Sequence, residues 1–236
     1  MTRRIVFLCS GGGGNLRFIA RAAELGTLPD ATIAAVLTDR ECLANQFARE
    51  QGLPTEVLDF GGERQQAVVT ALEALAPDVV VTNVHKILSP AVIEAARGRL
   101  INLHYSLLPA YGGVIGTRPV ELALANGAKF IGVTAHEVDV AVDAGRPIIQ
   151  AVLPTEPADT VASVMDTIFR CGCLVLLEAL RAPGESPSRA PARLCIHGRE
   201  VFINPALSFS VSAFDEPFWQ ALAAYPASPV TGSMRS

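Results

Sequence analysis

The chain has 236 residues, half of them hydrophobic, and a formal net charge of −4. A chain of this length can bury about 70 to 75% of its unfolded surface in one large domain or two small ones, so it needs no disulfide to fold. No run of Lys or Arg forms a basic stripe, which disfavours nucleic-acid binding and favours a small-molecule partner.

No segment approaches the roughly 20 apolar residues that a membrane-spanning helix requires, so no membrane partner is expected. The apolar stretch after Arg3 and Arg4 ends after five residues, which is too short for a secretory signal and is typical of a buried first strand. The expected compartment is therefore the cytosol.

Short β-branched runs alternate with stretches of helical periodicity along the first part of the chain. The expected strands are residues 5–9, 32–38, 55–60 and 79–83, and the expected helices are 15–25, 41–51 and 63–75. This alternation predicts βαβ units and a parallel sheet. The runs IVFLC, IAAVLT and VVVT are apolar on both faces, which indicates helices on both sides of the sheet.

The second part of the chain mixes further strands and helices with longer loops. The expected helices are 90–97, 118–125 and 160–180, and the expected strands are 100–105, 130–138 and 147–153. The acidic segment 139–145 is expected to be a loop because Asp and Gly are depleted in strands. The segment PGESPSRAP is expected to interrupt regular secondary structure. Residues 193–203 predict a hairpin around His197-Gly198. The tail after them has a weak helical pattern, and the sequence assigns it no function.

Five cysteines are scattered along the chain, at Cys9, Cys42, Cys171, Cys173 and Cys195. Their odd number and their placement in apolar runs indicate reduced thiols. Cys171 and Cys173 form the one close pair, and no second Cys or His pair stands at zinc-finger spacing, so no metal is expected.

A glycine-rich segment follows the first strand and opens a helix. Its members are Gly11, Gly12, Gly13, Gly14 and Asn15. Such a bare backbone can approach a ligand closely and aim N–H groups at an anion, so the segment predicts phosphate or carboxylate binding. It is neither a Walker A loop nor a dinucleotide fingerprint, and a tight turn without a ligand is the alternative.

Two groups of polar residues could carry chemistry. Asn102 and His104 lie two apart at the end of an expected strand, so both side chains emerge on one face. An amide can steady an oxyanion and a histidine can move protons near neutral pH, although a hydrogen-bonded core pair is the alternative. His136 ends another strand and is followed by Asp139 and Asp143; a carboxylate there could orient a histidine, or simply belong to a solvated turn.

Five segments, taken together and in order, resemble the folate-dependent formyltransferase family of phosphoribosylglycinamide formyltransferase. They are SGGGGNL, VHKILSP, INLHYSLLPA, TAHEVDVAVDAGRPII and the ADT before the last long helix. The resemblance covers residues 5 to about 203. It implies an α/β fold: a Rossmann-like, mostly parallel twisted sheet with flanking helices and a short C-terminal hairpin. It also implies a catalytic domain at 1–203, with an acceptor-binding half at 1–98, a folate-binding and catalytic half at 99–203, and a tail at 204–236.

The resemblance further implies that Asn102, His104 and Asp143 are catalytic and that 10-formyltetrahydrofolate is the co-substrate, with no metal and no covalent enzyme intermediate. Attack of an amine on the formyl carbon passes through an oxyanion, which Asn102 and protonated His104 could stabilise. Asp143 would pair with His104 and help to relay a proton. His136 and Ser106 would support these groups.

The remaining assignments concern binding. By analogy, the folate pterin would lie against Lys86, Ile87, Leu88, Val138 and Asp139. Lys86 stands where the family often has Arg, and it could meet the folate glutamate as a point charge. The glycine-rich segment would face a small-molecule amine acceptor and cradle its phosphate if it has one.

The sequence departs from the family pattern on the acceptor side. Gly172 and Cys173 stand where phosphoribosylglycinamide enzymes typically carry Glu and His, and Tyr105 stands where Pro is usual. A site that loses hydroxyl-binding groups discriminates differently among substrates. Phosphoribosylglycinamide and another amine or hydroxylamine, such as hydroxyornithine, both remain candidate acceptors.

Two other functions compete with formyl transfer. The same three side chains could activate water and release formate from 10-formyltetrahydrofolate, as the deformylase branch of the resembled family does. Deformylases usually carry an N-terminal regulatory domain, and none is expected before Thr2. A non-catalytic folate-binding protein is the other alternative, disfavoured because all three catalytic residue types are present. The sequence leaves the oligomeric state open, with a homodimer among the options.

Overall fold

The computed structural model describes residues 2–63, 65–181 and 189–225. Its strands are β1 (Arg3–Cys9), β2 (Ala31–Thr38), β3 (Thr55–Val57), β4 (Val79–Asn83), β5 (Leu100–His104), β6 (Phe130–Glu137), β7 (Pro147–Pro154), β8 (Ala192–Ile196) and β9 (Arg199–Asn204). Its helices are α1 (Gly14–Glu24), α2 (Leu43–Glu50), α3 (Gln66–Leu75), α4 (Pro90–Ala95), α5 (Arg118–Ala125), α6 (Val161–Arg181) and α7 (Glu216–Ala223), with a 3-10 turn, η1, at Val211–Ala213.

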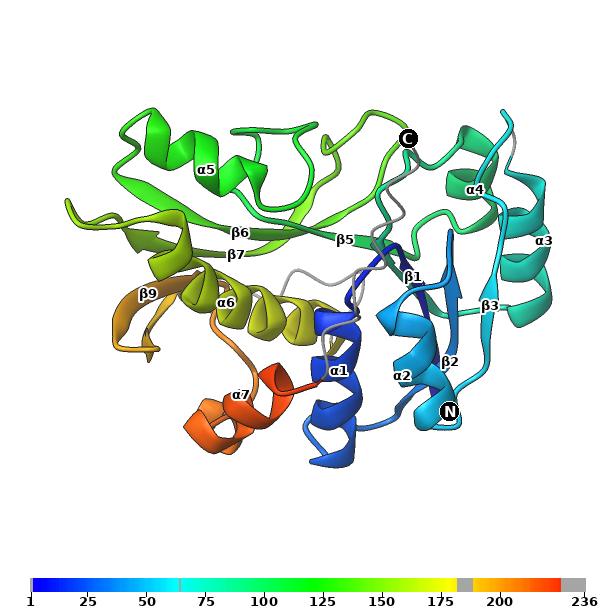
Figure 1. The fold of residues 1–236 in the computed structure, drawn as a ribbon, viewed down its shortest axis with the longest axis horizontal. Helices are drawn as coiled ribbons and strands as arrows, with labels where there is room; N and C mark the ends of the chain where they lie inside the picture. Colours follow the sequence, from blue (N-terminus) through cyan, green and yellow to red (C-terminus); the bar gives the residue numbers. More distant parts are fainter. Residues whose placement is uncertain (1, 64, 182–188, 226–236) are drawn as a thin grey trace, which may run out of the picture.

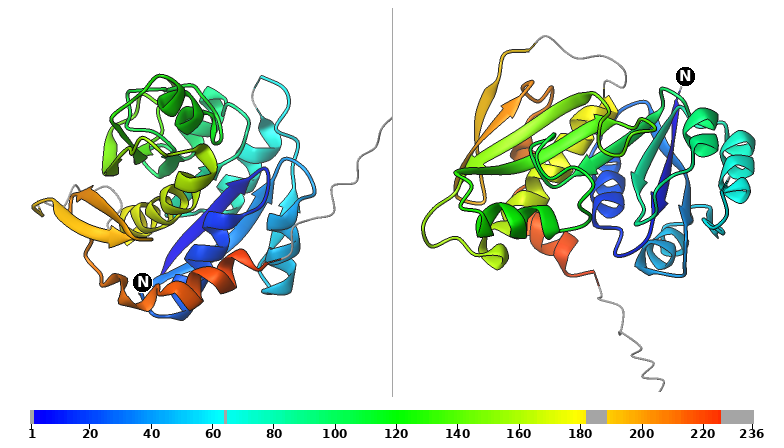
Figure 2. Two further views of the ribbon diagram at one scale, coloured as in Figure 1. Left: turned by 60° about the vertical axis from the view of Figure 1, so that its left-hand side comes forward. Right: turned by 90° about the horizontal axis from the view of Figure 1, so that it is seen from above.

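The strands form one sheet in the order β3-β2-β1-β4-β5-β6-β7-β9-β8 (Figures 1 and 2). Strands β1 to β5 run parallel to one another, which confirms the predicted βαβ units, and β6, β7, β9 and β8 extend the sheet from β5 by antiparallel pairing. The chain leaves β1 first toward β2 and later toward β4, so the strand order reverses between β1 and β4. The carboxyl ends of strands at such a reversal are where open α/β sheets bind ligands.

Successive residues of β1 point into two different cores. Ile5 and Phe7 belong to the core under α1, α2 and α6, whereas Val6 and Leu8 belong to the core under α3 and α4. All four side chains are buried. The strand is apolar on both faces because helices cover both sides of this part of the sheet.

Two expected boundaries were wrong by a few residues. Strand β3 ends at Val57 rather than at residue 60, because the Asp59 side chain accepts a hydrogen bond from the Gly61 N–H, 2.7 Å away, and closes a turn. Helix α3 begins at Gln66 rather than at residue 63, and the residue before it, Gln65, has a left-handed backbone with φ of 46°.

The C-terminal part folds back onto the main sheet and onto α1. The predicted hairpin is confirmed: β8 pairs with β9, and both turn residues, His197 and Gly198, have positive φ, as a type I′ turn requires. Helix α7 then packs on α1, where Trp219 stacks on Phe18 with ring centroids 5.4 Å apart. Of the predicted break PGESPSRAP, residues 183–188 lie outside the described part of the chain.

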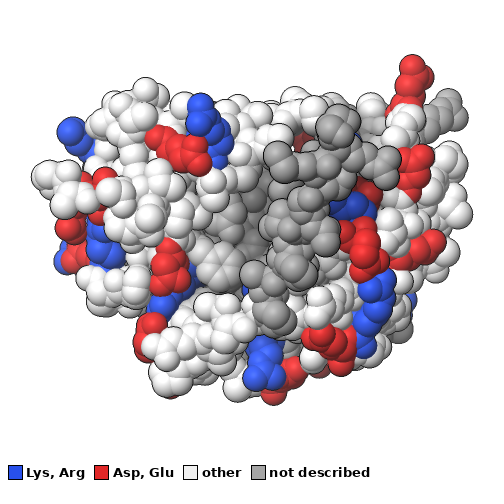
Figure 3. Space-filling view, in the orientation of Figure 1, with Lys and Arg blue, Asp and Glu red and all other residues white. Residues whose placement is uncertain are grey.

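Charge and cysteine placement follow the sequence analysis. All five cysteines are free thiols, as expected. Lys and Arg side chains lie among Asp and Glu on the face drawn in Figure 3. Within the described residues, no helix is both long and apolar enough to cross a membrane.

Candidate active site

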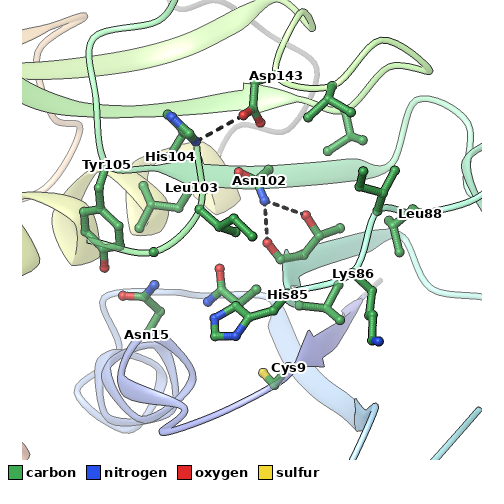
Figure 4. A pocket seen from close by; sticks show the side chains of 18 of the residues that line it. Cys9, Asn15, His85, Lys86, Leu88, Asn102, Leu103, His104, Tyr105 and Asp143 are labelled. Carbon is green, nitrogen blue, oxygen red and sulfur yellow. Dashed lines mark hydrogen bonds and ion pairs between the residues drawn. The ribbon is translucent and has the colours of Figure 1, made fainter. Parts of the chain in front are cut away.

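A cavity of about 450 Å³ opens at the carboxyl ends of β1, β4 and β5 (Figure 4). The loop after β1, the loop after β4 and the loop between β6 and β7 form its walls. Asn102, His104, His136 and Asp143 all line it, although they come from distant parts of the sequence. The structure therefore brings together in one cavity the three residues that the family resemblance singles out.

The Asn102 carboxamide is held by its neighbour in the sheet. Its Nδ2 donates to the Thr82 carbonyl oxygen, 2.7 Å away, and to the Thr82 Oγ1, 2.9 Å away. The register explains this contact, since Thr82 on β4 pairs with Asn102 on β5. Because a carbonyl oxygen can only accept, the contact also fixes which end of the carboxamide is nitrogen. Both amide hydrogens are thus used, and the Asn102 Oδ1 has no hydrogen-bond partner among the described residues.

The His104 imidazole is oriented at both nitrogens. Its Nε2 lies 3.1 Å from the Tyr111 carbonyl oxygen, and its Nδ1 lies 3.4 Å from Oδ2 of Asp143. The carbonyl requires a proton on Nε2, so Nδ1 is the nitrogen that exchanges a proton beside the carboxylate. The side chain is buried, with 8% of its surface exposed, and this limits competition from water.

Asp143 sits between two histidines. Its Oδ1 lies 3.6 Å from Nε2 of His136, and its Oδ2 accepts a 2.7 Å hydrogen bond from the Gly113 N–H. The backbone N–H holds this carboxylate oxygen in place. Two loops that are distant in sequence, 105–117 and 138–146, therefore meet at this carboxylate.

The loop that carries Asp143 is tight for a specific reason. Asp143 has a φ of 54°, in the left-handed region, and Gly145 lies so close to β6 that an added Cβ would stand 1.7 Å from the Glu137 carbonyl oxygen. Only glycine fits there. The Asp-x-Gly spacing seen in the sequence thus sets where the carboxylate enters the cavity.

His136 is the most buried histidine of the site. Its Nδ1 donates to the Glu137 carbonyl oxygen, 2.7 Å away, while its Nε2 has no hydrogen-bond partner within the described part of the chain. Burial lowers the pKa of His136, and the nearby Asp143 carboxylate opposes that shift only in part. His136 is therefore neutral at physiological pH and offers a lone pair, not a proton, to the cavity.

Ser106 lies behind the site rather than in its wall. Its hydroxyl donates to the Ala110 carbonyl oxygen, and its own carbonyl oxygen accepts a 2.7 Å hydrogen bond from Thr134 Oγ1. These contacts tie the turn after His104 to strand β6.

The five residues expected to contact folate all line the same cavity: Lys86, Ile87, Leu88, Val138 and Asp139. The segment that carries the first three is held by Gln65, a residue that no sequence pattern singles out. The buried Gln65 side chain donates to the Ile87 carbonyl oxygen at 2.9 Å and accepts from the Ser89 N–H at 2.9 Å. Ile87 itself is 75% exposed at the cavity mouth.

The glycine-rich segment lines the opposite end of the cavity. Gly11, Gly12, Gly13, Gly14 and Asn15 are all in the wall. Gly13 has a φ of 63°, and a Cβ at that position would stand 3.1 Å from Ala44, so the turn into α1 requires glycine. An added Cβ at Gly11 or Gly12 would meet nothing within 4 Å, which leaves their backbone open to a ligand.

Sequence reasoning missed several residues of this site. Thr82, Gly113 and Tyr111 fix the three central side chains, and His85 and Phe169 line the cavity. Thr82 ends an apolar strand, and its polar character was the one available signal. Tyr111 and Gly113 act through backbone atoms, which carry no signal in the sequence. Within the described residues, no cluster of three or more His, Cys, Asp or Glu side chains could hold a metal ion.

Comparisons with known proteins identify the family of the chain. The sequence profile of the formyl transferase family, Formyl_trans_N, matches residues 3–180. The chain is 33% identical over 206 residues to a phosphoribosylglycinamide formyltransferase of Mycobacterium tuberculosis, covering 85% of this chain and 94% of that protein. It is 33% identical over 168 residues to a formyltetrahydrofolate deformylase of Escherichia coli, covering 69% and 58%.

Solved structures of the same family share the fold. Glycinamide ribonucleotide transformylase 1 from Symbiobacterium toebii superposes with a TM-score of 0.70 at 30% identity, over 76% of this chain and 86% of that chain. The α/β class expected from the sequence is therefore confirmed, together with the expected enzyme class. The chain belongs to the formyl transferase family, and it is an enzyme.

Proposed function

We propose that the protein transfers the formyl group of 10-formyltetrahydrofolate to the amine of a small acceptor. The observation that carries this proposal is the contact between His104 and Asp143, 3.4 Å apart, beside Asn102 in one cavity. An amide, an imidazole and a carboxylate are the groups that acyl transfer to an amine needs, and the family match supports their assignment.

The donor end of the cavity is assigned to the segment Lys86–Leu88 and the loop 138–143. Apolar side chains of Ile87, Leu88 and Val138 offer a slot for the flat pterin, and Lys86 offers a charge for the folate glutamate. We assign the glycine-rich segment, at the other end, to the acceptor. The division into an acceptor half at 1–98 and a folate half at 99–203 stands as part of this proposal, except that Lys86–Leu88 falls on the donor side of the cavity.

The contacts of Asn102 change the role that we propose for it, which the sequence analysis expected to be stabilisation of the oxyanion. Both amide hydrogens of Asn102 are donated to Thr82, so Asn102 donates to an oxyanion only if one of them leaves Thr82. With the observed contacts, its free Oδ1 accepts an N–H of the attacking amine and holds the nitrogen in place. Each well-placed donor to an oxyanion is worth on the order of 3 kcal/mol, and His104 supplies one if an N–H on Nδ1 turns from Asp143 Oδ2, 3.4 Å away, to the oxyanion.

Asp143 has two tasks in this scheme. Its Oδ2 orients the His104 imidazole through Nδ1, 3.4 Å away, and its Oδ1, on the side of His136, is available to a water or amine proton. A proton lost by the attacking amine passes to this group and then to the folate nitrogen that leaves. General acid-base help of this kind contributes about 10²- to 10⁴-fold in rate.

The acceptor is either a phosphoribosylglycinamide-like amine or another amine or hydroxylamine, such as hydroxyornithine. The name of the Mycobacterium tuberculosis relative supports the first. The absence of Glu and His at Gly172 and Cys173 supports the second. A second candidate function, hydrolysis of 10-formyltetrahydrofolate to formate, is supported by the deformylase relative.

One experiment separates these functions. The protein is incubated with 10-formyltetrahydrofolate and a panel of amines that includes phosphoribosylglycinamide and hydroxyornithine, while tetrahydrofolate, formate and the formylated amine are measured. Transfer predicts tetrahydrofolate release only in the presence of an accepted amine. Release of tetrahydrofolate and formate without any amine would overturn transfer in favour of hydrolysis.

A further inference from the structure

We propose that the acceptor end of the cavity takes an amine carried on an apolar or aromatic body, rather than on a phosphorylated sugar. This inference rests on the proposed formyl transfer and concerns only which amine is used. Two aromatic side chains and the charges of the lining residues carry it.

The first aromatic side chain is Phe169, on α6. Its ring lies against the start of α1 so closely that a Cβ added at Gly14 would stand 2.9 Å from Cε2. Phe169 is only partly buried, and it lines the cavity together with the glycine-rich segment. One face of the acceptor end is therefore an aromatic ring that is open to a ligand.

The second aromatic side chain is Tyr105, which follows the β5 strand. It packs where Gly172 leaves room, since a Cβ added at Gly172 would stand 3.2 Å from Cε1 of Tyr105 and 3.0 Å from Cδ2 of Leu103. Burial raises the pKa of Tyr105, and the Asn15 side chain lies toward its hydroxyl (Figure 4). The phenol is therefore neutral, and its hydroxyl already faces the protein.

Asn15 is engaged on a second side as well. Its Oδ1 accepts from the Cys173 thiol at 3.5 Å, and the residue is 7% exposed. Asn15 is thus fixed between α1, α6 and Tyr105. Gly172 and Cys173 do not leave an empty hydroxyl-binding site; Tyr105 fills the space instead.

Positive charge is scarce at this end of the cavity. Of the described residues that line it, Lys86 is the one Lys or Arg, and it lies on the far side of His85 from Asn15 in Figure 4. The nearby Arg17 is not in the wall: it donates to the Gly12 carbonyl oxygen and stacks over the Tyr225 ring, 4.8 Å from its centroid. Among the described lining residues at this end, a phosphate dianion would find backbone N–H groups and the His85 imidazole but no guanidinium or ammonium to pair with.

These features favour a particular class of acceptor. A flat or apolar body can pack on Phe169 and Tyr105, and such aromatic contacts carry enough free energy to change affinity by up to about tenfold. The backbone N–H groups of the glycine-rich segment remain for one carbonyl or carboxylate oxygen of the acceptor. The reacting amine then extends toward Asn102 and His104.

The test compares two amines that share the same reacting glycyl nitrogen. N-benzylglycinamide carries an aryl ring, and phosphoribosylglycinamide carries a sugar phosphate. We expect kcat/KM with 10-formyltetrahydrofolate to be higher for N-benzylglycinamide, by up to about tenfold. In Phe169→Ala, the ratio of the two kcat/KM values should fall about tenfold, whereas Phe130→Ala, an exposed aromatic outside the cavity, should keep the ratio of the parent protein.

The remaining outcomes distinguish a wrong acceptor class from a wrong reaction. Faster formylation of phosphoribosylglycinamide, or an unchanged ratio in Phe169→Ala, would overturn this inference while formyl transfer stands. Formate release with neither amine formylated would overturn formyl transfer itself, and the inference with it. Because the readout is a ratio measured on one enzyme sample, partial loss of folding in a variant does not alter it.

Discussion

Oδ2 of Asp143 lies 3.4 Å from Nδ1 of His104, and the same oxygen accepts a 2.7 Å hydrogen bond from the Gly113 N–H. The carboxylate therefore both orients the imidazole and joins two loops. A substitution of Asp143 can therefore remove the carboxylate charge while keeping the contact that joins the loops, so the two roles can be tested separately.

Asp143→Asn removes the charge but keeps an oxygen for the Gly113 N–H. We expect kcat/KM for formylation to fall about 10²- to 10⁴-fold, because proton transfer through His104 loses its carboxylate, while the thermal midpoint changes little. Glu137→Gln is the matched control, since it neutralises a neighbouring carboxylate that pairs with Arg146 outside the cavity. Equal activity of Asp143→Asn and the parent protein would remove Asp143 from the mechanism.

Thr82→Val tests how Asn102 is positioned. The change removes the Oγ1 that accepts from the Asn102 Nδ2 at 2.9 Å and leaves the carbonyl contact in place. One such hydrogen bond is worth about 0.5 to 1.5 kcal/mol, so kcat should fall about threefold to tenfold with a smaller change in the KM of the donor. Thr82→Ser retains the hydroxyl and should restore kcat; a serine variant as slow as the valine variant would contradict this role.

The burial of His136 predicts that the free energy of unfolding depends on pH. Because burial lowers the pKa of His136, the unfolded chain binds more protons than the folded chain between the lowered pKa and the ordinary value of about 6.5. The contribution of His136 to the free energy of unfolding is therefore complete above pH 6.5 and is lost as the pH falls toward the lowered pKa. Urea unfolding at pH 7.5 and 5.5 measures it.

His136→Gln supplies the control for that measurement. The variant cannot titrate in this range, so its unfolding free energy should fall less between pH 7.5 and pH 5.5 than that of the parent protein. The neighbouring ionisable side chains, His104 and Asp143, are present in both proteins. An equal decrease in both would show that His136 is not the cause.

Trp219→Ala tests whether the C-terminal part stabilises α1. The indole is 7% exposed, stacks on Phe18, and lies 5.2 Å from the Arg170 guanidinium carbon. Truncating a buried aromatic side chain of this kind costs about 3 to 5 kcal/mol, which chemical denaturation followed by circular dichroism would detect. Glu216→Gln weakens the ion pair between the half-exposed Glu216 and Arg170 and should lower stability much less, because solvent screens the exposed carboxylate.

The sequence determined the architecture, because the periodicity of apolar residues sets which segments become strands and helices and which faces they bury. Ile5, Val6, Phe7 and Leu8 are apolar in succession, and a strand buried on both faces must be so. The spacing of Asn102 and His104 likewise determined that both side chains share a face, since a strand repeats every two residues. Local composition also determined that residues 139–145 form a loop, since Asp and Gly are depleted in strands.

Only the tertiary structure decided how these residues are used. The Thr82 contacts that occupy both Asn102 hydrogens, and the Tyr111 carbonyl that fixes the His104 proton, involve partners chosen by strand register and by backbone atoms. The fit of Phe169 to Gly14 and of Tyr105 to Gly172 depends on how α6 lies across α1 and β5. Such contacts join residues far apart in the chain, and no local pattern encodes them, because they depend on the positions that several elements reach together when the core packs.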